Sequence, residues 1–208
     1  MVNGVARIVS VLFHPLLLAT YLFGLFAFTL PQAFSPLKED GHFKFVLLIF
    51  CVTFLLPALN IGLFKVFGAI KSFAMDDRRD RIIPFLFMAT LYCAITYLFY
   101  SRTHIGFHDN LLKFLIIIDV LVVVATIVTM FYKVSVHSIG AWGIVGILLP
   151  LNKVVEDGTL FYPMLASIVI AGVVMTSRLQ LNAHTPREVM IGSILGLAAS
   201  FGCIVLLF

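Results

Sequence analysis

The sequence predicts an all-α protein, a polytopic transmembrane helix bundle of about six or seven spans. Of its 208 residues, 62% are hydrophobic and only 12% are charged, whereas soluble domains carry roughly a quarter charged residues. Runs of about 20 apolar residues recur along the chain, which is the length that crosses a hydrocarbon core. Because backbone groups in lipid need partners within their own segment, and no strand-like alternation occurs, each run is predicted to be a helix.

Seven apolar runs are candidate spans. The N-terminal run is too long for a signal peptide and no small-residue cleavage site follows it, so it is predicted to be a retained span. The fifth run is short and rich in glycine, which indicates a tilted helix or one partly buried among the others. The predicted spans are residues 8–31, 44–68, 82–100, 112–132, 137–152, 159–177 and 188–208. With no internal repeat and no low-complexity linker, residues 1–208 are predicted to form one transmembrane domain.

Basic residues and histidines gather in alternate loops. Because each span crosses to the other side, the loops after spans two, four and six are expected to share one membrane face. Clustered like charges persist most easily around an anion, and forked arginine donors suit a phosphate, here one attached to a lipid. Positive-inside topology is an alternative explanation for the arginines, but not for the histidines. The basic and imidazole residues of these loops, given with Glu188, are Lys71, Arg78, Arg79, Arg81, Lys133, His137, Arg178, His184, Arg187 and Glu188.

Other partners are disfavoured by the composition. The net charge is only +4, and no polybasic tract is present, so nucleic acid is not expected as a partner. The cysteines Cys51, Cys93 and Cys203 lie within apolar runs and lack CxxC spacing. They therefore predict neither a disulfide framework nor a zinc site.

The loop "SRLQLNAHTPRE" carries the most specific pattern. His184 and Glu188 are four residues apart, so on a helix they share one face. A carboxylate bonded to one imidazole nitrogen leaves the other as a nucleophile, and Arg178 can hold phosphoryl oxygens during the attack. However, Thr185 and Glu188 also form a capping-box pattern. The sequence alone leaves open whether Glu188 orients a nucleophile or only caps a helix.

Two further loops carry candidate residues. In "KVSVHS", His137 is a candidate general acid that protonates a leaving group. Ser135 and Ser138, at a helix start, can donate hydrogen bonds to a phosphate. In "KSFAMDDRRDRIIP", several cations are candidate phosphate clamps. The same loop contains a DDxxD spacing that can hold Mg²⁺ against a diphosphate, and a locally neutralised mixed-charge loop is the third possibility. The cations are Lys71, Arg78, Arg79 and Arg81, and the aspartates are Asp76, Asp77 and Asp80.

Together these loops resemble the motifs of the type-2 phosphatidic acid phosphatase superfamily, which also includes vanadium haloperoxidases. That pattern is K-x6-RP, then PSGH, then SR-x5-H-x3-D. The third element matches throughout, with Glu188 where aspartate is usual, and the second reads "VSVH" in place of "PSGH". The first has Lys71 and Arg78 at the right spacing, or Arg81 followed by Pro84 as a displaced version. The resemblance covers about residues 71–192.

The resemblance implies a helical core like that of the type-2 phosphatidic acid phosphatases (PAP2). It also implies a metal-independent lipid phosphatase that uses no cofactor and acts on a lipid phosphomonoester or diphosphate. It implies that His184 is the nucleophile that forms a phosphohistidine, His137 the general acid and Glu188 the orienting residue. The implied phosphate ligands are Lys71, Arg78, Ser135 and Arg178, with Arg81 in the displaced version. Two alternatives stay open: a catalytically silent relative that binds lipid or joins a protein complex, and a Mg²⁺-dependent prenyl-diphosphate enzyme.

The remaining cations predict the orientation. The side of the motifs keeps only Arg7 and Arg187 once its possible site cations are set aside. These cations are Lys71, Arg78, Arg79, Arg81, Lys133 and Arg178. The opposite side keeps more basic residues, and basic loops favour the cytoplasm. These are Lys38, Lys44, Arg102, Lys113 and Lys153. The protein is therefore predicted to be an integral protein of the bacterial inner membrane. Its site is predicted to face the periplasm or the cell exterior.

Overall fold

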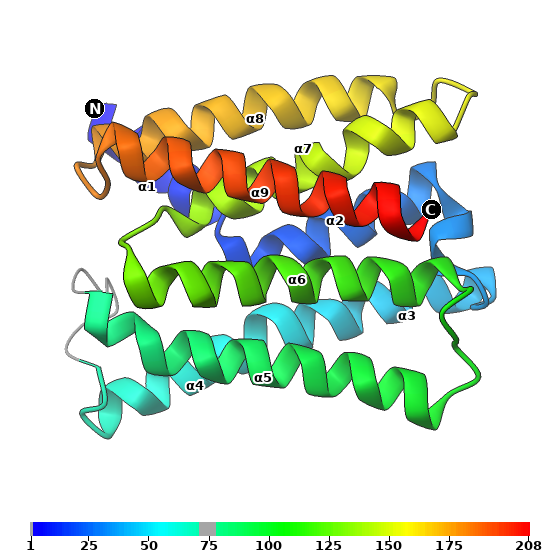
Figure 1. The fold of residues 1–208 in the computed structure, drawn as a ribbon, viewed down its shortest axis with the longest axis horizontal. Coiled ribbons are helices and arrows are strands. Elements are labelled where there is room, and N and C mark those ends of the chain that lie inside the picture. Colours follow the sequence, from blue (N-terminus) through cyan, green and yellow to red (C-terminus); the bar gives the residue numbers. More distant parts are fainter. Residues whose placement is uncertain (1, 71–77) are drawn as a thin grey trace. The chain divides into compact units, whose positions relative to one another are not determined.

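The structure is a computed structural model, and it describes residues 2–70 and 78–208. Within these residues the secondary structure is entirely helical (Figure 1), which confirms the predicted all-α class. Five of the described helices are long and apolar enough to cross a membrane, or six if a bent pair near the N-terminus counts as one span. The fold is thus compatible with an integral membrane protein.

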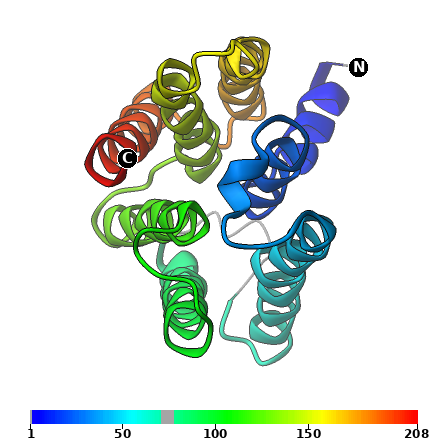
Figure 2. The same ribbon diagram turned by 90° about the vertical axis from the view of Figure 1, so that its right-hand side faces the viewer.

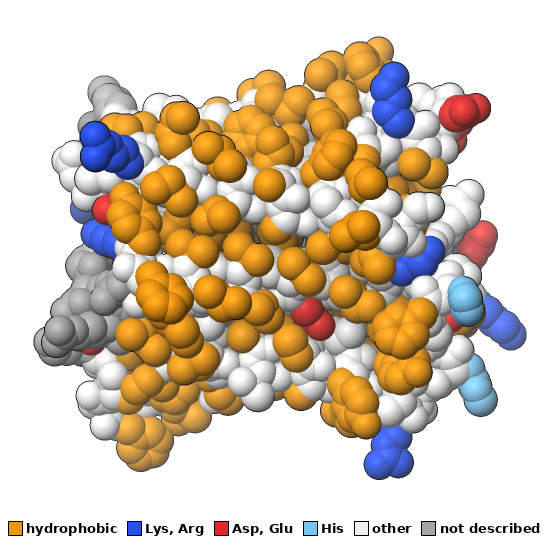
Figure 3. Space-filling model, viewed as in Figure 1, with side chains coloured by type: hydrophobic (Ala, Val, Ile, Leu, Met, Phe, Trp, Pro, Cys, Tyr) orange, Lys and Arg blue, Asp and Glu red, His pale blue; other side chains and the backbone are white. Residues whose placement is uncertain are grey.

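The chain forms two compact units, Met1–Leu18 with Lys133–Phe208, and Ala19–Tyr132. Figure 3 shows hydrophobic side chains along the helices, whereas the Lys, Arg and His side chains lie near helix ends. This distribution is what a lipid environment requires, because charged groups are costly away from the interface.

The first unit is built around α7, Val136–Val154. This helix contacts both α8, Phe161–Gln180, and α9, Pro186–Leu207 (Figures 1 and 2). A buried apolar cluster of Ala141, Val145, Ala171 and Val174 joins α7 to α8. The described α7 matches the predicted fifth run, but it is not among the candidate spans. Its glycines and polar ends lower its hydropathy, which suits a helix that packs against protein.

Two glycines let α9 approach α7 closely. A Cβ on Gly192 would lie 2.7 Å from the Ser135 carbonyl oxygen, and one on Gly196 would meet the Ile139 backbone. Small residues four apart on one helix face permit such close backbone contact in membrane helices. As a result, the first turns of α7 and α9 are held side by side. The loops that contain the second and third predicted motifs, "KVSVHS" and "SRLQLNAHTPRE", therefore lie at this end of the unit.

The predicted first span, residues 8–31, is broken. The structure has α1 at Val2–Leu12 and α2 at Pro15–Thr29, with a 60° bend between them. Pro15 explains the break, because proline lacks an N–H and disfavours a helical conformation at the preceding residue, His14. Helix α1 packs along α8, which brings the break to the first unit's motif loops.

The second unit contains most of α2 and the helices that follow it as far as α6. The predicted second span begins earlier than expected, since Glu39–Val66 is one long helical run that includes a π-helical turn. A buried hydrogen bond crosses between its helices, since Tyr92 Oη donates to the Thr53 carbonyl at 2.8 Å. Its elements after α2 are η1 Pro31–Phe34, α3 Glu39–Phe50, η2 Cys51–Leu55, α4 Leu56–Val66, α5 Arg78–Arg102 and α6 Asn110–Phe131.

Candidate functional site

The turn between α8 and α9 presents His184 to the interior of the first unit. Asn182 adopts a left-handed conformation with φ of 50°, and the Ala183 N–H donates to the Arg178 carbonyl at 3.2 Å. Asparagine tolerates this conformation better than most residues. The turn therefore folds back on α8, and His184 is buried at 8% exposure.

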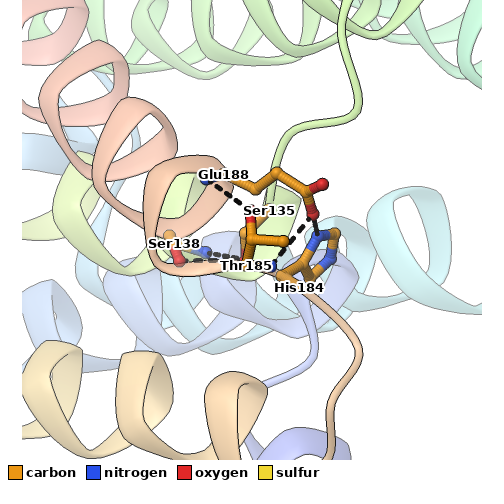
Figure 4. A network of polar contacts seen from close by, with 5 residues as sticks. All are labelled: Ser135, Ser138, His184, Thr185 and Glu188. Carbon is orange, nitrogen blue, oxygen red and sulfur yellow. Dashed lines mark hydrogen bonds and ion pairs between the residues drawn. The ribbon is translucent and has the colours of Figure 1, made fainter.

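Glu188 both orients His184 and caps α9 (Figure 4). Its Oε2 lies 2.7 Å from Nδ1 of His184 and also accepts from the Thr185 N–H at 3.3 Å. The Glu188 N–H in turn donates to Thr185 Oγ1 at 3.4 Å, which completes a capping box. The contact with the imidazole and the contact with the helix cap are thus made by the same carboxylate oxygen. In a neutral imidazole, this bond places the proton on Nδ1 and leaves Nε2 unprotonated.

The start of α7 lies against the start of α9. The Ser135 N–H donates to the Glu188 carbonyl at 3.2 Å, and Ser135 is the N-cap of α7. Its Oγ accepts from the Ser138 N–H at 3.4 Å and from Ser138 Oγ at 2.9 Å, with both serines fully buried. The first N–H groups of a helix have no intrahelical partner, and they favour an anion.

His137 is the second residue of α7. It lies close enough to Arg178 and His184 for their charges to lower its pKa, although burial lowers it most. Its Nε2 is 3.0 Å from the Ser10 carbonyl oxygen. Because a carbonyl only accepts, Nε2 of His137 carries a proton in this arrangement, and Nδ1 is the ring nitrogen that remains for other partners. The two predicted imidazoles therefore lie in the same part of the first unit.

The break between α1 and α2 adds two residues that sequence reasoning assigned no part in the site. Ser10 Oγ accepts from a terminal nitrogen of Arg178 at 3.4 Å. The rings of His14 and His137 meet edge to face with centroids 5.4 Å apart, and His14 Nδ1 accepts from the Leu16 N–H at 3.3 Å. That bond leaves the proton of a neutral His14 on Nε2, which has no partner among the described residues. The histidine–proline pair was the available signal, since it marks a helix break.

The first predicted motif is placed only in part. Lys71, Asp76 and Asp77 lie outside the described residues, and α5 begins at Arg78. Arg81 is buried at 8% exposure in α5, in the second unit. The roles of Lys71, Arg78 and Arg81 as phosphate ligands stay predictions. Among the residues that the structure describes, no group of three or more His, Cys, Asp or Glu side chains is placed to hold a metal ion.

The first unit thus gathers one oriented imidazole, two further imidazoles and a guanidinium near two helix N-termini. The nearby carboxylate is already bonded to His184, so the cluster as a whole favours an anion with several acceptor oxygens. No protein-family model, curated protein or solved structure matches this chain.

Proposed function

We propose that the protein is a metal-independent lipid phosphatase that acts through a phosphohistidine intermediate. The 2.7 Å contact between His184 Nδ1 and Glu188 Oε2 carries the proposal, because it prepares Nε2 as a nucleophile. The resemblance of the motifs to type-2 phosphatidic acid phosphatases, with their PAP2-like core, supports the same reading. The candidate spans and the loop charges favour a place in the bacterial inner membrane, with the site facing the periplasm.

In the first proposed step, His184 Nε2 attacks the phosphorus of the lipid phosphate. A nitrogen–phosphorus bond forms while the bond to the lipid oxygen, or to the leaving phosphate of a diphosphate, breaks. Arg178 and the first N–H groups of α7 hold the phosphoryl oxygens. Lys71, Arg78 and Arg81 stay phosphate ligands that only the motif resemblance implies.

His137 protonates the leaving oxygen. Because its Nε2–H is donated to the Ser10 carbonyl, the transferred proton comes from Nδ1 of an imidazolium. Burial and the nearby Arg178 guanidinium lower the pKa of His137, and a bound phosphate opposes that shift, because an opposite charge nearby stabilises the cationic form. In the second step, Nδ1 accepts a proton from water, the resulting hydroxide oxygen attacks phosphorus, and the nitrogen–phosphorus bond breaks to release inorganic phosphate.

His14 contributes a neutral donor to the same phosphate. Its Nδ1 accepts from the Leu16 N–H, so its Nε2–H is available to a phosphoryl oxygen. The contact with the His137 ring places it on the side of α7 that faces α1. We assign it to substrate binding, because a neutral imidazole is a good hydrogen-bond donor but a poor acid.

A catalytically silent lipid-binding or complex subunit is the second candidate, and one observation favours it. Ser10 engages both the imidazole of His137 and the guanidinium of Arg178. Because Nε2–H of His137 is held by Ser10, a protein whose His137 stayed neutral would have no proton on Nδ1 to transfer, and it would bind a lipid phosphate without completing the reaction.

The two functions separate by phosphate release from purified protein. We expect release without divalent cations from at least one of phosphatidic acid, phosphatidylglycerophosphate, undecaprenyl diphosphate or a lipid A phosphate. His184→Ala abolishes release, whereas the matched control His108→Ala, on an exposed loop, retains it. Release that survives in His184→Ala contradicts the proposed nucleophile. Binding of these lipids without release by the wild type supports the silent subunit.

A further inference from the structure

Asp119 lies in the middle of a candidate membrane span. It belongs to α6, Asn110–Phe131, which is long and apolar enough to cross a membrane. At 1.5 Å per residue, Asp119 is about 14 Å from one end of this helix and about 18 Å from the other, close to the centre of a ~30 Å hydrocarbon core. A carboxylate is costly at that depth, so an ionisable side chain there points to a function.

Within the described residues, no cation neutralises this carboxyl group. None of their lysine, arginine or histidine side chains forms an ion pair with Asp119. The ionisable side chains within electrostatic reach of Asp119 are Tyr92 and Cys93, both from α5, and both types are ordinarily neutral at about pH 7. An ionised Asp119 is therefore an uncompensated charge in hydrocarbon, which a bound proton removes.

The neighbours of Asp119 are hydroxyl groups. The Thr96 side chain lies within hydrogen-bonding reach of the carboxyl group. One turn earlier on the same face of α5, Tyr92 Oη donates to the Thr53 carbonyl at 2.8 Å. Thr53 belongs to the π-helical turn Cys51–Leu55, and such turns are frequent at functional sites. Thr53 Oγ1 is itself buried without a hydrogen-bond partner in the described part of the chain, so a polar cluster lies between three candidate spans.

A hydroxyl partner suits a carboxyl group that gains and loses a proton. The Thr96 hydroxyl can donate to an ionised carboxylate and can accept from a protonated one, whereas a paired cation would hold the acid in its ionised form. We infer that Asp119 is an intramembrane proton-binding site, with Thr96 as its hydrogen-bond partner in both states. The inference is independent of the proposed phosphatase, because none of these residues takes part in that mechanism.

Infrared spectroscopy of the full chain in liposomes of ether-linked phosphatidylcholine, a lipid without ester carbonyls, tests the inference. A protonated carboxyl group has a C=O stretching band that ionised carboxylates in the loops lack at about pH 7. We expect this band in the wild type, its reversible loss as the pH is raised, and its absence in Asp119→Asn. The matched control Asp109→Asn, at the N-cap of the same helix, is expected to keep the band. Thr96→Val is expected to shift the band, because the carboxyl group loses its partner.

Several results overturn the inference. A wild type without the band at neutral pH has an ionised Asp119, and a band that survives in Asp119→Asn belongs to another residue. A band that persists at every alkaline pH at which the protein stays helical makes Asp119 a permanently neutral packing residue. Loss of the band on addition of NaCl at constant pH assigns the cluster to a cation instead. An unshifted band in Thr96→Val removes Thr96 from the site.

Discussion

The double role of Glu188 can be separated into its two parts by a pair of substitutions. Thr185→Ala removes the hydroxyl that accepts from the Glu188 N–H at 3.4 Å, but it leaves the carboxylate on His184. Loss of such a cap costs about 1 kcal/mol of stability. Glu188→Ala removes the reciprocal half of the cap and also the 2.7 Å bond to His184 Nδ1. A hydrogen bond to a charged group is worth about 1.5–3 kcal/mol.

If that bond holds the nucleophile in place, its loss raises the barrier by a similar amount. Since each 1.36 kcal/mol is a factor of ten in rate, Glu188→Ala is expected to lower kcat by about 10–100-fold. Thr185→Ala is expected to lower the melting temperature while changing kcat little. Phosphate release and thermal unfolding in the same detergent measure both quantities, and acid-labile phosphate on the protein reports the intermediate. Equal losses of kcat in the two variants would show that Glu188 acts only as a cap, and the reasoning would fail.

Gly192→Ala should destabilise the first unit by about 1–3 kcal/mol, because its Cβ would lie 2.7 Å from the Ser135 carbonyl oxygen; a melting temperature equal to wild type contradicts this. His14→Phe keeps the ring but loses the Nε2–H donor, so KM should rise several-fold, with partial rescue by His14→Gln, and an unchanged KM removes His14 from the site. EDTA should leave phosphate release unchanged, whereas inhibition that Mg²⁺ reverses favours the aspartate-rich loop. Arg187→Cys, exposed beside the site, should react in intact cells with a membrane-impermeant thiol reagent, and labelling only after lysis reverses the proposed orientation.

Local interactions made much of the fold predictable. Each apolar run is predicted to be helical because a helix satisfies all of its backbone hydrogen bonds within one segment. The partnership of His184 with Glu188 is likewise local, since residues four apart on a helix share a face. The competing readings, orienting and capping, could not be separated from the sequence because both require the same residues. Only the geometry reveals that one carboxylate oxygen meets both the ring and the backbone.

Contacts between distant segments could not be predicted in the same way. Ser10 and Arg178 are 168 residues apart, and hydrophobicity identifies a span without identifying its neighbours. The proline after His14 predicts a helix break, but not that the broken end meets α7. Similarly, the spacing of Gly192 and Gly196 indicates a close helix contact, while the partner helix is apparent only in three dimensions.

Two residues at the start of α7 depart from the motif of the resembled family. Val136 stands where the family has glycine, and it is the first residue of α7, with Ser135 as the N-cap. The N–H groups of the first turn lack intrahelical acceptors whatever side chain they carry, so valine at this position keeps the backbone donor. Val134, where the family has proline, is fully buried and would lie 3.3 Å from a Cβ on Gly192. The substitutions therefore alter packing between α7 and α9 and leave the backbone N–H donors at the start of α7 in place.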